Sequence, residues 1–302
     1  MGWIDVHHHI LPPRFVAEQR DDILYFARDP AVLDWTPERA LEQLDRFGID
    51  TAYASLGVPG APDPPLARAC NEYAADLKRD HRGRFGVFAS LPLPDVDASL
   101  SELEYAFDQL GADGIGLLSN YGGRHLGDPR FAPLLDELDR RSAVVHVHPI
   151  APPSCRGVLP GYPDPFLEFP FDTTRVVTSL LYTGAFTRWP RISFIFSHGG
   201  GAVPMLSQRI AALAQMTASI SDPLGRLSTI RVDAVTTTSP PAFAAVSELL
   251  GPERVLFGSD YPYVPIAATA EGLRDLRLGA DELEAIGRGN AVGLLGRRTQ
   301  YD

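Results

Sequence analysis

Histidines with the spacing of metal ligands open the chain, in the segment Asp5-Val6-His7-His8-His9. Residues two apart in an extended strand point to the same side, so His7 and His9 project together and His8 points away. Two imidazoles at that spacing can reach one ion. Asp5, one step deeper on the same side, is expected to orient a ligand imidazole. A solvated histidine cluster at a strand end explains this segment alone equally well.

His146 and His148 repeat the two-apart pattern just before Pro149. Only one of the pair needs to be a ligand, and His148 is the better candidate because it lies nearer the predicted strand end. His146 is expected to lie behind it, against a ligand or in the core. A single histidine in such a run is more often a core residue, so this segment alone leaves both interpretations open.

His198 and Asp260 follow two later strand-like runs. Three glycines follow His198 and allow close approach of the backbone to a ligand, although they could also simply make a tight turn. A histidine on such a turn is well placed for acid–base chemistry. Asp260 could bind a metal and exchange a proton with water; its alternative role as a helix N-cap is weakened by Pro262. Three imidazoles and a carboxylate suit zinc, with manganese as the second choice.

The elements that must position these residues form an alternating pattern. Eight strand-like runs are each followed by a helical pattern, and six of the eight histidines lie in or just after such a run. This alternation predicts one α/β domain over residues 1–302, a (β/α)₈ TIM barrel whose strand ends converge on one mouth. The predicted strands are residues 3–6, 51–55, 85–89, 114–118, 143–147, 192–196, 230–234 and 255–257.

Two segments are predicted to be loop insertions at the C-terminal face of the barrel. Residues 11–36 are aromatic and are expected to be irregular, and residues 151–170 are rich in Pro and Gly. Loops at this face line the active site of a barrel, so both segments are candidate substrate walls. The aromatic candidates, each of which could equally be a core residue, are Phe26, Trp35, Tyr162, Phe166 and Tyr263.

Composition excludes several classes of partner. The net charge is −11 and the sequence has no basic run, so nucleic acid and anionic membranes are not expected to bind. No apolar stretch approaches the length of a membrane span, and the N-terminus lacks the pattern of a secretion signal. The two cysteines have no paired spacing, which suits a reducing compartment. We therefore expect a cytoplasmic protein.

The four motifs together closely resemble those of the amidohydrolase superfamily, in the branch of aminocarboxymuconate-semialdehyde decarboxylase and related nonoxidative decarboxylases. This resemblance implies that His7, His9, His148 and Asp260 bind one divalent metal ion, usually zinc, and that His198 is the catalytic histidine. It also implies a homodimer and a small carboxylic acid as substrate.

Arg209 lies eleven residues after His198, the spacing at which the semialdehyde decarboxylase has an arginine that anchors a substrate carboxylate. The planar guanidinium binds a carboxylate through two parallel hydrogen bonds, which suits this role. A surface or structural arginine is the equally weighted alternative.

Residues 167–175 and 7–13 resemble the 6-methylsalicylate decarboxylase group more closely. The chain keeps histidine at the first metal position, where some resorcylate decarboxylases have glutamate, and it has no acidic residue in the three positions after His198. The leading hypothesis is therefore loss of CO₂ from a hydroxy-aromatic or unsaturated carboxylic acid.

Two other functions compete with this hypothesis. The same metal centre could activate water to hydrolyse a lactone, an amide or a cyclic imide. A barrel that binds a ligand without catalysis is the third possibility. The retention of the whole set of His7, His9, His148, His198 and Asp260 argues against it, because a catalytically dead homologue typically loses a ligand.

Overall fold

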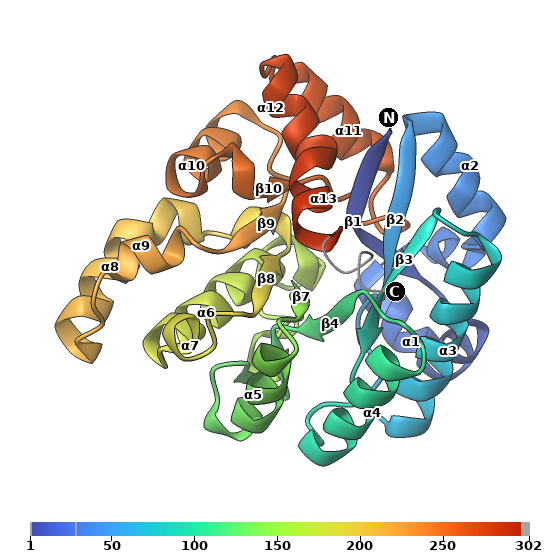
Figure 1. The fold of residues 1–302 in the computed structure, drawn as a ribbon, viewed down its shortest axis with the longest axis horizontal. Helices are drawn as coiled ribbons and strands as arrows, with labels where there is room; N and C mark the ends of the chain where they lie inside the picture. The colour runs from blue at the N-terminus through green and yellow to red at the C-terminus, as the bar shows by residue number, and fades with distance from the viewer. Residues whose placement is uncertain (1, 28, 297–302) are drawn as a thin grey trace.

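A computed structural model describes residues 2–27 and 29–296 of the chain. Its parallel strands lie inside a ring of helices (Figure 1). The strands of the eight-stranded sheet are β1 (Trp3–Ile10), β2 (Ile49–Leu56), β3 (Phe85–Ser90), β4 (Gly114–Leu118), β7 (Val144–His148), β8 (Ser193–Phe196), β9 (Arg231–Asp233) and β10 (Val255–Leu256).

The sheet curls so that its first strand meets the segment that follows its last strand. The Val6 N–H donates to the Phe257 carbonyl oxygen at 3.0 Å, and the His9 N–H donates to the Tyr261 carbonyl oxygen at 2.7 Å. Neighbouring strands pair in chain order around the ring. Each of the eight predicted strands overlaps one of these strands, and the predicted (β/α)₈ barrel is confirmed.

Helices cover the outside of the barrel in chain order (Figure 1). They are α1 (Pro13–Ala27), α2 (Pro37–Phe47), α3 (Pro64–Asp80), α4 (Val96–Asp108), α5 (Ala132–Arg140), α6 (Glu168–Tyr182), α7 (Ala185–Arg188), α8 (Val203–Ala218), α9 (Pro223–Leu227), α10 (Pro240–Leu250), α11 (Ile266–Asp275), α12 (Ala280–Glu284) and α13 (Asn290–Leu295). A two-stranded hairpin, β5 (Asn120–Tyr121) and β6 (Arg124–His125), follows β4. None of the helices in the described part of the chain has the length and apolar character needed to cross a membrane.

Local sequence sets where several helices begin. Thr36 caps α2 by accepting a hydrogen bond from the Arg39 N–H, and Asp63 caps α3 by accepting one from the Leu66 N–H. Proline at the start of each helix has no N–H to leave unsatisfied and has a helical φ. Such caps fix the short turns between strands and helices.

Two layers of apolar side chains hold the barrel together. A large core lies between the strands and the helices, and a smaller one fills the barrel interior. The smaller core includes Phe88 on β3, whose ring stacks against the His146 ring at 5.8 Å between centroids. The polar residues at the strand ends therefore pack against the apolar core of the barrel interior.

The prediction that residues 11–36 are irregular is wrong. This segment contains α1 and a 3₁₀ turn, η1 (Pro30–Asp34). Phe15, Ile23 and Phe26 form the buried face of α1, but the backbone at Gln19 leaves the helical region, at φ −120° and ψ 16°. This kink interrupts the apolar periodicity, which explains why the sequence pattern does not reveal the helix.

Residues 151–170 contain little regular structure, as their composition predicts. Two single turns, η3 (Pro153–Cys155) and η4 (Asp164–Phe166), interrupt the segment before α6 begins at Glu168. The segment leaves several apolar side chains exposed to solvent, including Val158 and Phe166. Its position directly after β7 places it beside the strand end that carries His148.

Gly201, in the turn after His198, has a backbone that only glycine adopts readily. Its φ is +65° and its ψ is −129°, and a Cβ there would collide with the Pro170 carbonyl oxygen. We expect Gly201→Ala to lower the free energy of unfolding by about 3 kcal/mol or more, through backbone strain and overpacking. Urea denaturation measures this loss.

Gly111 is the matched control, because its φ is +63° and a Cβ there would meet nothing within 4 Å. Gly111→Ala should lower the free energy of unfolding by only about 1–2 kcal/mol, the cost of the left-handed backbone alone. Equal losses in the two variants would contradict a tight contact between the His198 turn and α6.

Candidate metal centre and active site

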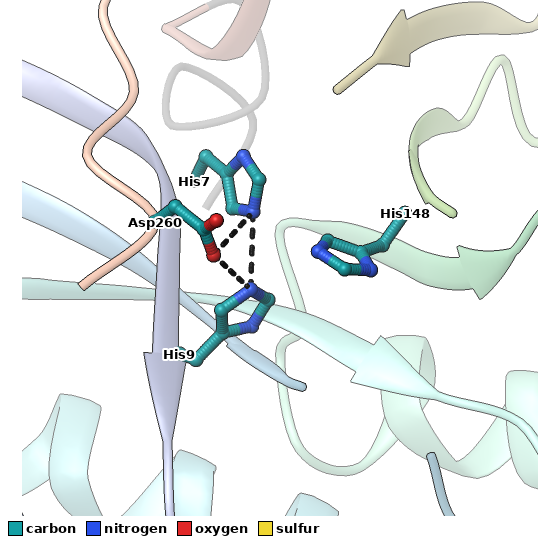
Figure 2. Close-up of side chains that lie close together, drawn as sticks. All are labelled: His7, His9, His148 and Asp260. Carbon is teal, nitrogen blue, oxygen red and sulfur yellow. Dashed lines mark hydrogen bonds and ion pairs between the residues drawn. The ribbon is translucent and has the colours of Figure 1, made fainter. Parts of the chain in front are cut away.

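Four of the predicted site residues converge at the C-terminal mouth of the barrel. His7 and His9 lie on β1, His148 ends β7, and Asp260 follows β10; their side chains point toward one another (Figure 2). The Nε2 atoms of His7 and His9 are 3.0 Å apart, and Asp260 Oδ1 lies 3.3 Å and 3.1 Å from them. One ligand atom from each of the four residues lies within 4.8 Å of all the others.

Contacts behind the three histidines fix which ring nitrogen faces the centre. His7 donates its Nδ1 proton to Asp233 Oδ2 at 2.8 Å, and His148 donates its Nδ1 proton to the Pro149 carbonyl oxygen at 2.8 Å. The His9 Nδ1 lies 3.2 Å from Ser55 Oγ. With Nδ1 engaged in each ring, the Nε2 atoms face inward, the arrangement found around metal ions in proteins.

Asp233 and Ser55 are two further site residues that were not predicted from the sequence. Asp233 is a carboxylate inside the apolar run Ile230-Arg231-Val232-Asp233-Ala234, and its position at a predicted strand end was a usable signal. Ser55 lies at the end of β2 without any comparable pattern around it. The closure of the barrel brings Asp233 on β9 to His7 on β1, and the pairing of β1 with β2 brings Ser55 to His9.

The expected role of Asp5 is wrong. Asp5 Oδ2 lies 3.2 Å from the His8 Nδ1 and accepts a hydrogen bond from the Ser259 hydroxyl at 2.6 Å. The cause is a bulge in β1, where the three steps from Asp5 to His8 pair with only two steps of β2, from Ala52 to Ala54. The extra residue moves Asp5 to the side of His8.

His8 itself lies away from the centre, as strand alternation predicts. Its side chain is buried, and its ring packs against Tyr261 with the centroids 5.2 Å apart. His146 lies behind the centre, with its Nε2 3.2 Å from Ser197 Oγ and 3.6 Å from Asp233 Oδ2. Burial lowers the pKa of His146 to about 4, so its imidazole is neutral.

His198 and Asp260 lie side by side, with His198 Nε2 3.3 Å from Asp260 Oδ2. The backbone N–H of His198 donates to Asp233 Oδ1 at 2.9 Å, so one carboxylate holds both His7 and the turn that carries His198. His198 and Asp260 have φ values of 57° and 60°, in the left-handed region that non-glycine residues rarely adopt. Strained backbone of this kind is concentrated at functional sites.

Opposing charges set the protonation of the centre. Burial disfavours a charged His7, but the charges of Asp233 and Asp260 outweigh it and raise the pKa of His7 to about 10. Burial lowers the pKa of His9 and lowers that of His148 further. Burial would raise the pKa of Asp260, but the positive charge of His7 and the contacts with His198 hold it well below its usual range. Without a metal, the cluster therefore carries a proton on His7 and a carboxylate at Asp260.

A cavity of about 910 Å³ reaches this cluster. His148, His198 and Asp260 form part of its wall, and most of the remainder is apolar. Four of the five aromatic wall candidates line it: Phe26, Tyr162, Phe166 and Tyr263. The fifth, Trp35, is buried in the main core instead.

Arg209 lies on the exposed side of α8. It is not among the described residues that line the cavity. The structure of one chain therefore does not bring Arg209 to the site, and its role in binding a substrate carboxylate stays a prediction.

The sequence matches the amidohydrolase family model over residues 4–297. It is 36% identical to decarboxylase yanB of Aspergillus niger, over 98% of this chain and 88% of that protein. It is 33% identical to the 6-methylsalicylic acid decarboxylase of Penicillium expansum, over 88% of this chain and 86% of that protein. A 2-amino-3-carboxymuconate-6-semialdehyde decarboxylase of Dictyostelium discoideum is 27% identical over 95% of this chain and 85% of that protein.

The fold has solved relatives. The crystal structure of 5-carboxyvanillate decarboxylase from Sphingomonas paucimobilis superposes with a TM-score of 0.88 at 22% identity, covering 98% of this chain and 99% of that one. At that identity the likeness shows the fold alone. The family model and the fungal relatives decide the membership: this chain belongs to the amidohydrolase family, in the branch that contains the 6-methylsalicylic acid decarboxylases.

Proposed function

We propose that this chain is a metal-dependent, nonoxidative decarboxylase of a hydroxy-aromatic acid, with one divalent ion held by His7, His9, His148 and Asp260. The observation that carries the proposal is the convergence of three inward-facing imidazoles and a carboxylate beside an apolar cavity. The prediction of a carboxy-lyase of this superfamily agrees with relatives named as decarboxylases of 6-methylsalicylic acid and gamma-resorcylate.

The residues present fit a metal ion. Asp260 Oδ1 is buried and makes no hydrogen bond to the described residues, although two imidazole nitrogens lie 3.1 Å and 3.3 Å away. Two ligands of a tetrahedral zinc ion, each about 2.1 Å from it, would be roughly 3.4 Å apart. A bound ion would supply Lewis acidity and a fixed point of attachment for the substrate carboxylate and its neighbouring hydroxyl.

Asp260 and His198 are placed to handle the proton that decarboxylation requires. The ring carbon must gain a proton before its bond to the carboxylate breaks and CO₂ leaves with restoration of the aromatic ring. Asp260 is ionised and can take a proton from the substrate hydroxyl or water and deliver it to that carbon. His198 Nε2 lies beside Asp260 Oδ2, and its buried Nδ1 has no partner among the described residues. Because His198 lines the cavity, we expect its ring to hydrogen-bond to a substrate oxygen there and stabilise the charge that develops on it.

The identity of the metal ion, the role of Arg209, the oligomeric state and the cellular location are further parts of this proposal. Zinc is the expected ion because the ligand set combines imidazoles with one carboxylate, and manganese is the alternative. For Arg209 a surface role is the better supported alternative, because the residue is exposed and is not among the described residues that line the cavity. A homodimer is expected from the family resemblance, and a cytoplasmic location from the composition of the sequence.

Release of CO₂ tests the reaction directly. The metal-loaded protein should convert salicylate-type acids to CO₂ and the corresponding phenols. His198→Asn should lower kcat by about 10²–10⁴-fold because it removes a positioned acid–base group, while the metal content stays unchanged. Coupled CO₂ detection and elemental analysis measure the two quantities.

His81→Asn is the control, because His81 lies at the end of α3, before β3 begins, at the opposite end of the barrel from the metal centre. Its kcat should equal that of the unmodified protein. Ring opening of a lactone without CO₂ from any acid would identify the chain as a hydrolase instead. A protein that neither binds zinc or manganese nor turns over either substrate class would be a binding barrel.

Asp233→Asn should weaken metal binding by about 10–100-fold, since an amide holds the His7 ring less firmly than a carboxylate does. Competition with a chromogenic chelator measures the affinity. Asp139→Asn is the matched control: this buried carboxylate binds Arg191, which precedes β8 at the other end of the barrel. Unchanged affinity in the Asp233 variant would show that the contact with His7 does not support the metal ligand.

Metal binding should release about one proton per ion at pH 6. The pKa of His7 is raised to about 10, so its imidazole is protonated at that pH and must lose its Nε2 proton to become a ligand. The lowered pKa values of His9 and His148 keep these two rings neutral. Calorimetry in buffers of different ionisation enthalpy counts the protons. Release should decline as the pH rises past 10, and no release at pH 6 would contradict the assigned charge of His7.

A further inference from the structure

The active-site cavity is far larger than a benzoate ring needs. Its volume is about 910 Å³. A cavity of roughly 150 Å³ already accepts benzene, and pockets of about 300–1,000 Å³ hold ligands of drug size. A hydroxybenzoate attached to the metal centre would leave most of this space unfilled.

The wall beyond the metal centre is mainly apolar. It is built by the end of α1 and by the segment from Leu159 to Pro170, with Phe26, Phe166 and Phe169 as its aromatic members. Apart from the cluster at His148, His198 and Asp260, the polar side-chain groups in the lining are the hydroxyls of Tyr162, Thr236 and Tyr263. No Lys or Arg occurs among the described lining residues.

Neither Arg156 nor Arg209 is among the described residues that line the large cavity. The Arg156 guanidinium lies over the Phe26 ring, 5.3 Å from its centroid, and Arg156 lines a neighbouring cavity of about 230 Å³ that shares His148 with the large one. Arg209 is exposed on α8 and does not line the cavity. A second carboxylate in the large cavity would therefore lose its hydration without gaining an ionic partner.

Apolar side chains of the wall are also exposed to solvent. Tyr162 is 61% exposed, Phe166 67%, and Leu159 and Leu167 are 43% and 44% exposed. All four line the cavity. A contiguous exposed apolar surface that borders a catalytic centre is typical of a ligand-binding groove, because a bound apolar group removes that surface from water.

We infer that the substrate is a 2-hydroxybenzoate with a single carboxylate and an apolar substituent of several carbon atoms, whose chain packs along the wall formed by residues 159–170. The inference rests on the proposed decarboxylase function and adds its substrate class. The polar cluster binds the carboxylate end, and the wall selects the substituent.

A substrate series tests this assignment on the metal-loaded enzyme. The series contains 2-hydroxybenzoates with a methyl, propyl or pentyl chain at ring carbon 4, 5 or 6. In at least one positional series, kcat/KM for CO₂ release should rise roughly two- to fourfold per added methylene, or about 16-fold or more from methyl to pentyl. A chain of the same length that ends in a carboxylate should lose this gain. Constant or falling kcat/KM in all three series, with the methyl acids turned over, would overturn the inference.

The variant Phe166→Ser tests where the alkyl substituent of the substrate binds. Because this variant removes an apolar wall residue, the ratio of kcat/KM for the pentyl and methyl acids should fall about three- to tenfold. Leu159→Ser should act in the same direction. Phe171→Ser is the matched control, since Phe171 is also exposed, at 44%, but does not line the cavity. An unchanged ratio of kcat/KM for the pentyl and methyl acids in both wall variants would overturn the placement of the alkyl substituent along the wall.

A wrong decarboxylase proposal and a wrong assignment of the apolar substituent would give different results. If no acid in the series released CO₂, the decarboxylase proposal would be wrong, and binding would still decide the character of the cavity. The dissociation constants of 3-methylphenol and 3-pentylphenol, measured by calorimetry on the metal-loaded protein, should then differ by the same factor per methylene. Equal dissociation constants would refute an apolar chain site.

Discussion

One buried carboxylate connects the parts of the centre. Asp233 is fully buried; it accepts the Nδ1 proton of His7 at 2.8 Å and the backbone N–H of His198 at 2.9 Å. The Val235 N–H adds a third hydrogen bond at 3.1 Å. A carboxylate removed from water is tolerated only with such partners, so the same contacts that stabilise Asp233 also fix the His7 ring and the turn that carries His198.

The barrel makes this arrangement possible because it brings distant strand ends to one place. β1 supplies two histidines, β7 one, and the turns after β8 and β10 supply His198 and Asp260. Both of the latter residues have left-handed backbone, and Gly201 continues the turn after His198 where a Cβ would collide with Pro170. A rigid sheet with a packed interior can hold such strained turns in position.

The site divides its tasks between a charged cluster and an apolar wall. The buried groups of the cluster act on one another strongly because water is excluded; the raised pKa of His7 and the lowered pKa of Asp260 both reflect this. The wall comes mainly from the segment after β7, which contains little regular structure. The charged cluster therefore lies on the strand ends, and most of the cavity wall lies on a loop that can change without disturbing the barrel.

The sequence by itself determined the barrel, because eight apolar strands alternating with helices give a pattern that local periodicity reveals. It also indicated the cluster of His7, His9, His148, His198 and Asp260, since strand ends in a barrel must converge. It did not reveal α1, whose kink at Gln19 breaks the helical period, or the displacement of Asp5 by the bulge in β1. Only the tertiary structure assigned Asp233 to His7 and Ser55 to His9, because these contacts join residues far apart in the chain whose pairing depends on strand register. It also decided that Arg209 is exposed and that the cavity wall is apolar, because both depend on which side of a helix or loop faces the barrel mouth.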